Sequence, residues 1–294
     1  MKLTESEIVL LDVETCNPQT PKVIELAGLR WKMGRPIAAA HFKETFIDPG
    51  QKVDPATQSV HHISDKDLEG APRLEDIQDE WKDWVGDRII VAYNSEFDRT
   101  ALSSTPLFDC SWLDAYRAAM HFWSLGQEND DGFALSSLKQ QELRYWLKVP
   151  EVLGDAHRAA ADIQVTAYVM ERIMQNYLEC GQKDSMESFV SFVNGPICHD
   201  TFPIGGKIFQ GKRAEDVPDW ALRKAFDEES DWHAPFAKFN VLDCLRPEFV
   251  RRFGVTPEKP QPSRGSGFKP AIKTQQPPPS SSPGPDRWKR TSQF

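Results

Sequence analysis

The chain has 294 residues, 39% of them hydrophobic, which is enough to bury one sizeable core in one or two domains. No apolar run approaches the roughly 18–20 residues that a membrane helix needs, and acidic residues occupy the N-terminus where a secretory signal would carry positive charge. The five cysteines are scattered without any C-x-x-C spacing, which argues against a disulfide framework or a zinc site. We therefore expect a globular protein of the cytoplasm that does not enter a membrane.

The formal net charge of −9 argues against a polyanionic ligand at first sight. Residues 257–294 hold seven Lys and Arg against two Asp and Glu, so they contribute +5 and the remainder of the chain carries −14. An acidic body still binds phosphate if divalent cations lie between its carboxylates and the ligand. Charge alone therefore does not exclude a nucleic acid.

Residues 1–180 show strand patterns first and helical patterns later. Apolar and β-branched runs predict strands at Ile8–Leu11, Val23–Ala27, Ile37–Ile47 and Ile89–Val91. Apolar spacing predicts helices at Leu74–Val85, Phe97–Leu102, Leu113–Phe122, Leu135–Leu143 and Arg158–Leu178. This order predicts one α/β domain with a mixed central sheet flanked by helices.

The remaining chain divides into three parts. Residues 181–199 are polar and small, which indicates a linker, and residues 200–254 form a small module of a Gly-spaced hairpin and a helix. That module is too short to support much core of its own. Residues 255–294 are rich in Pro, Ser and Gln and are predicted to be disordered.

Asp12 and Glu14 follow the first apolar run and lie two residues apart. Because side chains alternate along a strand, both carboxylates point to one side and Val13 points to the other. Two such carboxylates repel each other unless they are protonated or bridged by a cation, and their oxygens suit Mg²⁺ or Mn²⁺. An acidic loop at the end of a strand is the alternative interpretation.

Asp98 lies in the first turn of a helix that Asn94 or Ser95 caps, directly after a buried strand. The helix dipole favours an aspartate at this position for structural reasons alone. The segment by itself therefore does not distinguish a functional carboxylate from a structural one.

His157 and Asp162 lie at the start of the long helix. Five residues on a regular helix rotate by about 140°, so we place His157 on the loop that enters the helix. Asp162 shares a face with Val165 and Val169. A lone carboxylate that heads an apolar stripe needs a partner, and a metal ion would be one.

Together, the segments Asp12-Val-Glu14, Asn94-Ser-Glu-Phe-Asp98 and His157-Arg-Ala-Ala-Ala-Asp162 resemble the three motifs of the DEDDh 3′→5′ exonucleases. Each motif is weak alone, but their order, separations and final five-residue spacing make the set specific. The resemblance implies a ribonuclease H-like fold. Val60-His-His-Ile-Ser64 and the hairpin after residue 200 further resemble bacterial exodeoxyribonuclease X, although Gly205-Gly206-Lys207 departs from that pattern.

The resemblance implies a metal-dependent enzyme that releases 5′-mononucleotides from the 3′ ends of DNA, in repair or end processing. Asp12, Glu14, Asp98 and Asp162 would hold two Mg²⁺ ions, for which Mn²⁺ would substitute, and His157 would act as general base. The residues implied to bind the terminal nucleotide are Val13, Thr15, His61, Asn94 and Phe97. For His61, a polar residue at a helix end is an equal alternative.

The function of residues 200–294 stays open at this point. Basic residues of the module, with Phe209 and Trp220 nearby, suit a nucleic acid but equally suit a solvated face; they are Lys207, Lys212, Arg213, Arg223 and Lys224. The tail suits either a protein partner or a nonspecific phosphate-binding arm. The alternatives for the whole chain are a 3′→5′ exoribonuclease of the same fold and a polymerase-associated proofreading subunit.

Overall fold

The computed structural model describes residues 1–37, 40–150, 157–197, 213–231, 233, 236 and 242–254. The chain divides into two compact units, Met1–Gly195 and Pro196–Phe294, which we treat separately. The expected hairpin at 202–212 and the tail at 255–294 lie outside the described residues.

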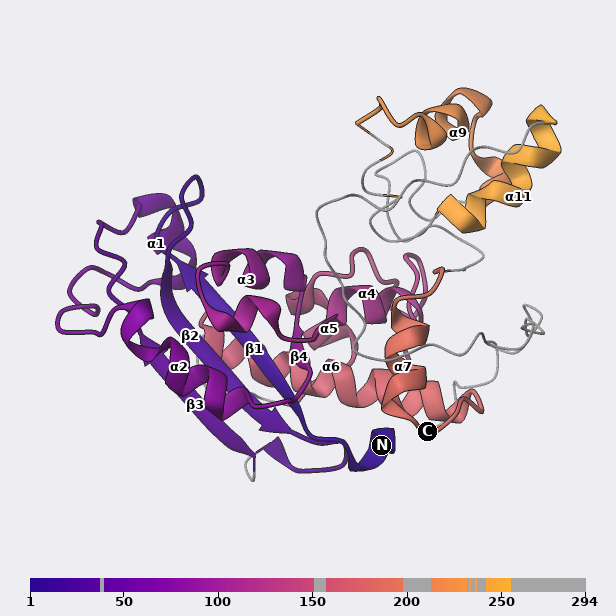
Figure 1. Cartoon of the computed structure of the whole chain (residues 1–294). Helices are drawn as coiled ribbons and strands as arrows, with labels where there is room; N and C mark the ends of the chain where they lie inside the picture. The colour runs from indigo at the N-terminus through magenta and orange to yellow at the C-terminus, as the bar shows by residue number, and fades with distance from the viewer. Residues whose placement is uncertain are drawn as a thin grey trace. The chain divides into compact units, whose positions relative to one another are not determined.

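The first unit is built on a five-stranded mixed sheet (Figure 1). Its strands are β1 (Ile8–Thr15), β2 (Val23–Trp31), β3 (His41–Phe46), β4 (Ile90–Ala92) and β5 (Trp112–Asp114). Their order is β3-β2-β1-β4-β5, with β1, β2 and β3 antiparallel and with β4 and β5 parallel to β1. This arrangement confirms the predicted α/β class and the ribonuclease H-like fold.

Seven helices of the first unit have described bounds. They are α1 (Pro55–His61), α2 (Leu74–Val85), α3 (Ser95–Ala101), α4 (Ala115–Met120), α5 (Gln140–Trp146), α6 (Ala159–Glu179) and α7 (Met186–Val193). Short 3₁₀ turns lie at Leu3–Glu5 and Pro106–Asp109.

Strand β1 is the centre of the sheet, and this position explains its sequence. Residues Ile8–Leu11 are all at most 1% exposed, because neighbours cover the strand on both edges and both faces. A strand buried on both faces reads as a continuous apolar run. From Asp12 onward, half-buried and buried residues alternate along the strand.

Helices α2 and α6 cover opposite faces of the sheet (Figure 1). On α2, Ile77, Trp81 and Val85 are spaced by four residues and pack in one cluster with the β1 residues Val9 and Val13. On the opposite face of the sheet, helix α6 packs on β1 and β2 through a stripe of buried residues. The face of β1 that carries Asp12 and Glu14 is therefore the face that α6 covers.

Several segments differ from the sequence-based expectation. The helix expected at Leu113–Phe122 is found at Ala115–Met120, and Leu113 and Asp114 belong instead to β5, which is too short to show a strand period. Helix α5 begins at Gln140, five residues later than expected, and residues 135–139 are not helical. Within the expected linker, Met186–Val193 form α7, whose side chains at Met186, Phe189 and Val193 are buried.

The described part of the second unit contains a 3₁₀ turn at Ala214–Asp216 and two helices, α9 (Asp219–Phe226) and α11 (Leu242–Phe253). Leu222 and Phe249 are buried, and the rings of Phe226 and Phe249 lie 4.7 Å apart. Arg252 donates to the carbonyl of Val217 and to the carboxylate of Asp219. In the described residues of both units, no helix is long and apolar enough to cross a membrane.

Candidate active site

Three carboxylates converge where β1 ends against the first turn of α6. Asp12 and Glu14 extend from the strand, Asp162 extends from the helix, and one oxygen of each lies within 4.8 Å of the others. Asp12 and Glu14 are half-buried and Asp162 is buried. The structure thus brings together residues that 150 positions of chain separate, because α6 packs along β1.

Asp98 joins this group from a third element. It lies in the first turn of α3, is 2% exposed, and accepts a hydrogen bond from the backbone N–H of Val13 at 3.1 Å. Among the charges near Asp12, that of Asp98 raises the Asp12 pKa most. Asp98 therefore lies next to β1 at Val13, between Asp12 and Glu14, so the four carboxylates predicted from the sequence are neighbours.

The electrostatics of the cluster favour a bound cation. Burial, and then the charges of Asp98 and Glu14, raise the pKa of Asp12 well above its ordinary range. Burial, and then the charge of Asp162, raise the pKa of Glu14 to about 8. Burial also raises the pKa of Asp162 to about 6. Carboxylates that cannot all ionise alone are stabilised as anions by a divalent ion with oxygen ligands, so this donor set fits one.

His157 occupies the loop that enters α6, as the sequence predicted. Its side chain is exposed and its φ is +61°, a left-handed conformation that is uncommon for a residue other than glycine. The backbone N–H of His157 bonds to the carboxylate of Asp162. The histidine is thereby attached to the carboxylate cluster while its ring stays accessible to solvent.

The five expected nucleotide contacts fall into two groups. Asn94 and Phe97 are exposed at the start of α3, with Phe97 46% exposed, and Asn94 has a left-handed φ of +65°. Val13 and Thr15 are buried, the Val13 side chain in the cluster under α2. His61 is 1% exposed and its Nδ1 accepts a hydrogen bond from Ile63. Only Asn94 and Phe97 present open side-chain surface to a ligand.

The sequence reading missed three residues that support this site. Gln141 on α5 donates to Oδ1 of Asp162 at 2.8 Å. Glu25 on β2 is fully buried beside Glu14, and Arg158 donates to it from the start of α6. A signal existed for Glu25, since it is a single charged residue inside the apolar run of β2.

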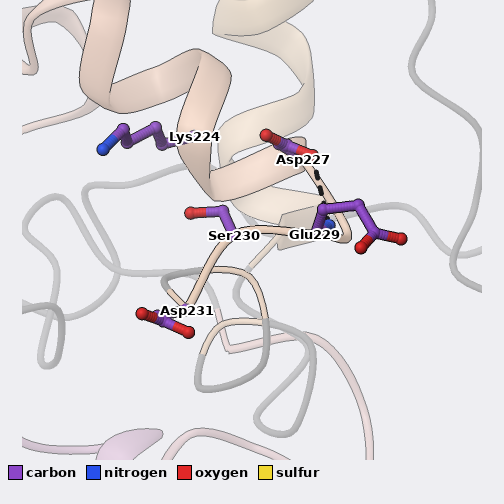
Figure 2. A pocket seen from close by; sticks show the side chains of 5 residues that line it. All are labelled: Lys224, Asp227, Glu229, Ser230 and Asp231. Atoms are coloured by element: carbon purple, nitrogen blue, oxygen red, sulfur yellow. Dashed lines mark hydrogen bonds between the residues drawn. The ribbon is translucent and has the colours of Figure 1, made fainter.

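The second unit has a separate surface hollow (Figure 2). It is lined by Lys224, Asp227, Glu229, Ser230 and Asp231, and the Glu229 N–H donates to Asp227 at 3.2 Å. The apolar lining that is typical of a small-molecule site is absent from these five residues. Of the module's expected basic residues, Arg213 pairs with Glu215 at 3.3 Å and Arg223 stacks on Phe253 at 3.7 Å. Lys207 and Lys212 lie outside the described residues.

The chain is similar in sequence and in fold to known nucleases and DNA polymerases. The exonuclease family RNase_T matches residues 9–170. The PolC-type DNA polymerase III of Staphylococcus haemolyticus is 29% identical over 181 residues, which are 61% of this chain and 12% of the polymerase. The similarity thus spans about an eighth of the length of that relative.

Among solved structures, an exonuclease X bound to 5′-overhanging duplex DNA has a similar fold. The TM-score is 0.50 at 22% sequence identity, over 63% of this chain and 99% of the exonuclease X chain. The matched portion is therefore a complete chain in that protein and a small segment in the polymerase.

Proposed function

The chain belongs to the exonuclease family RNase_T, and on that premise we propose that it is a metal-dependent 3′→5′ exodeoxyribonuclease. It releases 5′-mononucleotides from the 3′ ends of DNA. The observation that carries the proposal is the approach of Asp12, Glu14 and Asp162 within 4.8 Å, with Asp98 alongside. This is a set of oxygen donors of the kind that binds a divalent cation.

Asp12, Glu14, Asp98 and Asp162 would hold the divalent ions, with Mg²⁺ as the expected metal and Mn²⁺ as a substitute. When bound, such ions activate water and stabilise negative charge on a phosphodiester. Asp98 also accepts the N–H of Val13 through Oδ1 at 3.1 Å. That bond fixes the rotamer of Asp98 against β1.

His157 would take the proton from the attacking water. Its ring is exposed at the edge of the carboxylate cluster, and its backbone is held by Asp162. A general base must reach the proton that it takes, and an exposed ring beside the carboxylates supports this role. Asn94 and Phe97, exposed at the start of α3, would line the pocket for the terminal nucleotide, and Phe97 offers a ring on which a base stacks.

Two observations support DNA as the substrate. The exonuclease X structure contains duplex DNA with a 5′ overhang, and the PolC-type relatives are DNA polymerases. A biological role in DNA repair or end processing is part of this proposal. The second candidate is an exoribonuclease, because the carboxylates would contact the phosphodiester and not the 2′-hydroxyl.

The deciding experiment compares 5′-labelled single-stranded DNA, the matched RNA, and duplex DNA, each with Mg²⁺ and with chelator. We expect a ladder of stepwise shorter labelled DNA products with Mg²⁺ and intact substrate with chelator. A blocked 3′ terminus should protect the strand. Faster digestion of RNA than of DNA would replace the first candidate with the second, and release of the labelled 5′ nucleotide as the first product would refute the polarity.

A further inference from the structure

Glu25 is a fully buried carboxylate that the proposed metal site does not use. It lies on β2 directly opposite Glu14 of β1, with 0% exposure. Arg158 donates to Oε1 of Glu25 from Nη2 at 2.6 Å and also from Nε at 3.2 Å. The backbone N–H of Ala159 donates to Oε2 at 3.0 Å. Three such donors hold this buried carboxylate in one geometry.

These bonds act at the start of α6. Arg158 precedes the helix and Ala159 is its first residue. By accepting the N–H of Ala159, the Glu25 side chain on β2 caps the start of α6. The residue just before Arg158 is His157, whose left-handed φ of +61° persists only if its surroundings hold it. Asp162 holds the N–H of His157, and Glu25 holds the two residues after it.

We infer that Glu25 and Arg158 are positioning residues that set the place of His157 for proton transfer. The inference rests on the proposed role of His157 as general base. Neither residue touches the reacting atoms. Their contact, together with that of Ala159, fixes the start of α6 against β2, and so fixes the Cα of His157 relative to the carboxylate cluster.

A second role for Arg158 would be electrostatic. Its charge lies close enough to Glu14 to lower the Glu14 pKa, against the larger effects of burial and neighbouring carboxylates. It also lies 3.7 Å from Glu44. A substitution that keeps the charge but removes the fork separates this role from positioning, because lysine is a point charge and arginine is a planar double donor.

The test is a double-mutant cycle between Arg158→Lys and His157→Ala, measured in single turnover at saturating single-stranded DNA. In the wild-type background we expect Arg158→Lys to lower the rate by about 10–100-fold, the loss that a misplacement of about 1 Å produces. In the His157→Ala background the same change should cost less than about twofold, since the group being positioned is gone. The substrate KM and the half-activating Mg²⁺ concentration should change by less than about threefold.

Equal losses in both backgrounds would overturn the inference, as would a loss that excess Mg²⁺ restores. Absence of digestion by the wild-type protein would instead refute the proposed function, so the two failures are distinguishable. Glu25→Gln, which keeps the volume and one acceptor, serves as the second variant and should show the same dependence on His157. Thermal unfolding of each variant establishes that it is folded under the assay conditions.

The matched control is Arg30→Lys. Arg30 lies on the same strand as Glu25 and donates to Glu7 through Nε and Nη2 at 3.3 and 3.2 Å. Its substitution by lysine therefore removes a similar two-nitrogen contact. It lies at the other end of β2, opposite Val9 of β1. Its rate should stay within about twofold of wild type; a loss equal to that of Arg158→Lys would show that any broken fork on this sheet slows the enzyme.

Discussion

The side-chain amide of Gln141 donates a hydrogen bond of 2.8 Å to Oδ1 of Asp162, which joins α5 to the carboxylate cluster. The preceding residue, Gln140, bonds to the backbone oxygen of Asp162 at 2.6 Å and to Thr166 at 2.8 Å. Two consecutive glutamines thus hold the first turn of α6 from its side. Only Gln141 reaches the carboxylate, so it orients the ligand oxygen itself.

Gln141→Ala should therefore raise the Mg²⁺ concentration for half-maximal activity by about 10–100-fold, the usual cost of losing an outer partner of a metal ligand. Maximal activity at saturating Mg²⁺ should recover to a large extent. A Mg²⁺ titration of the cleavage rate measures both quantities. Gln175→Ala, which removes a bond to Glu171 farther along α6, is the control and should leave the titration unchanged.

Asp12→Asn should abolish hydrolysis and leave the fold intact. Asparagine lacks the negative charge with which the Asp12 carboxylate would hold the metal. Its loss should remove several kcal/mol of transition-state stabilisation, which lowers the rate by about 10³-fold or more. Burial and Asp98 already favour the protonated form of Asp12 without metal, so a neutral amide there should keep the unfolding midpoint in chelator within about 2 °C. The rise in midpoint on adding Mg²⁺ should disappear. Asp79→Asn on the exposed face of α2 should behave as wild type, and hydrolysis by Asp12→Asn near the wild-type rate would remove Asp12 from the site.

The stability of the metal-free protein should fall as pH rises from about 4.5 to 8. Glu14 has a pKa of about 8 in the folded protein against an ordinary 4.5, and Asp162 about 6 against 3.8. Between the ordinary pKa and the raised pKa of each group, the folded state binds more protons than the unfolded state. The free energy of unfolding therefore decreases as pH rises through that range. The contribution of these two carboxylates to stability is fully present below about pH 4 and is lost as pH rises through 6 for Asp162 and through 8 for Glu14.

Denaturant unfolding in chelator at several pH values measures this slope. Mg²⁺ binds the deprotonated carboxylates, so its stabilising effect should grow as pH rises over the same range. Glu14→Gln should flatten the slope in chelator, particularly between pH 6 and 8. A slope that Glu14→Gln leaves unchanged would show that other groups cause the pH dependence.

Gly28→Ala should destabilise the sheet without changing the chemistry. A Cβ at Gly28 would lie 2.7 Å from Cζ3 of Trp84 and 2.9 Å from Cζ3 of Trp81. Trp81 is fully buried and cannot move aside, so the overpacking should cost about 1–3 kcal/mol of unfolding free energy. The double variant Gly28→Ala, Trp84→Phe should recover part of that loss. A loss that the second substitution does not reduce would mean that Trp84 is not the obstacle.

The sequence predicted those helices whose apolar residues recur at helical spacing within the element itself. The helix expected at Leu74–Val85 has those same bounds, and the long helix expected at Arg158–Leu178 is found at Ala159–Glu179. The strand β5 and the helix α7 were not predicted, since their burial depends on elements far away in the chain. For α7, the carbonyl of Val193 accepts from Nε of Arg117 at 2.6 Å, a contact that no local pattern reveals.

The same distinction holds at the site. Asp12, Glu14, Asp98 and Asp162 stand at element ends, where a carboxylate is visible against apolar neighbours. Glu25 stands inside a strand, where it is a single charged residue in an apolar run, but only the fold shows that it lies opposite Glu14. Its partner Arg158 is 133 residues away, so the pair exists only in three dimensions.

The C-terminal tail, residues 257–294, has a net charge opposite in sign to that of the rest of the chain. Residues 257–294 carry +5 against −14 for residues 1–256. If these basic residues contact phosphates, removing residues 257–294 should weaken binding to single-stranded DNA and make its salt dependence shallower. Each lost contact lowers the slope of log affinity against log salt by about 0.7 for single strands.

The proposed metal ligands and His157 all precede residue 163, so the shortened protein should cleave saturating substrate at the wild-type single-turnover rate. Binding measured at several salt concentrations separates this effect from a general loss of folding, which would alter the cleavage rate as well. A full-length variant with the seven basic residues of the tail changed to Gln is the matched control, since it keeps the length and removes the charge. It should lose the same slope as the truncation. If the truncated and full-length proteins instead bind with equal affinity and slope, the tail does not hold nucleic acid, and a protein partner becomes the explanation for its Pro-rich sequence.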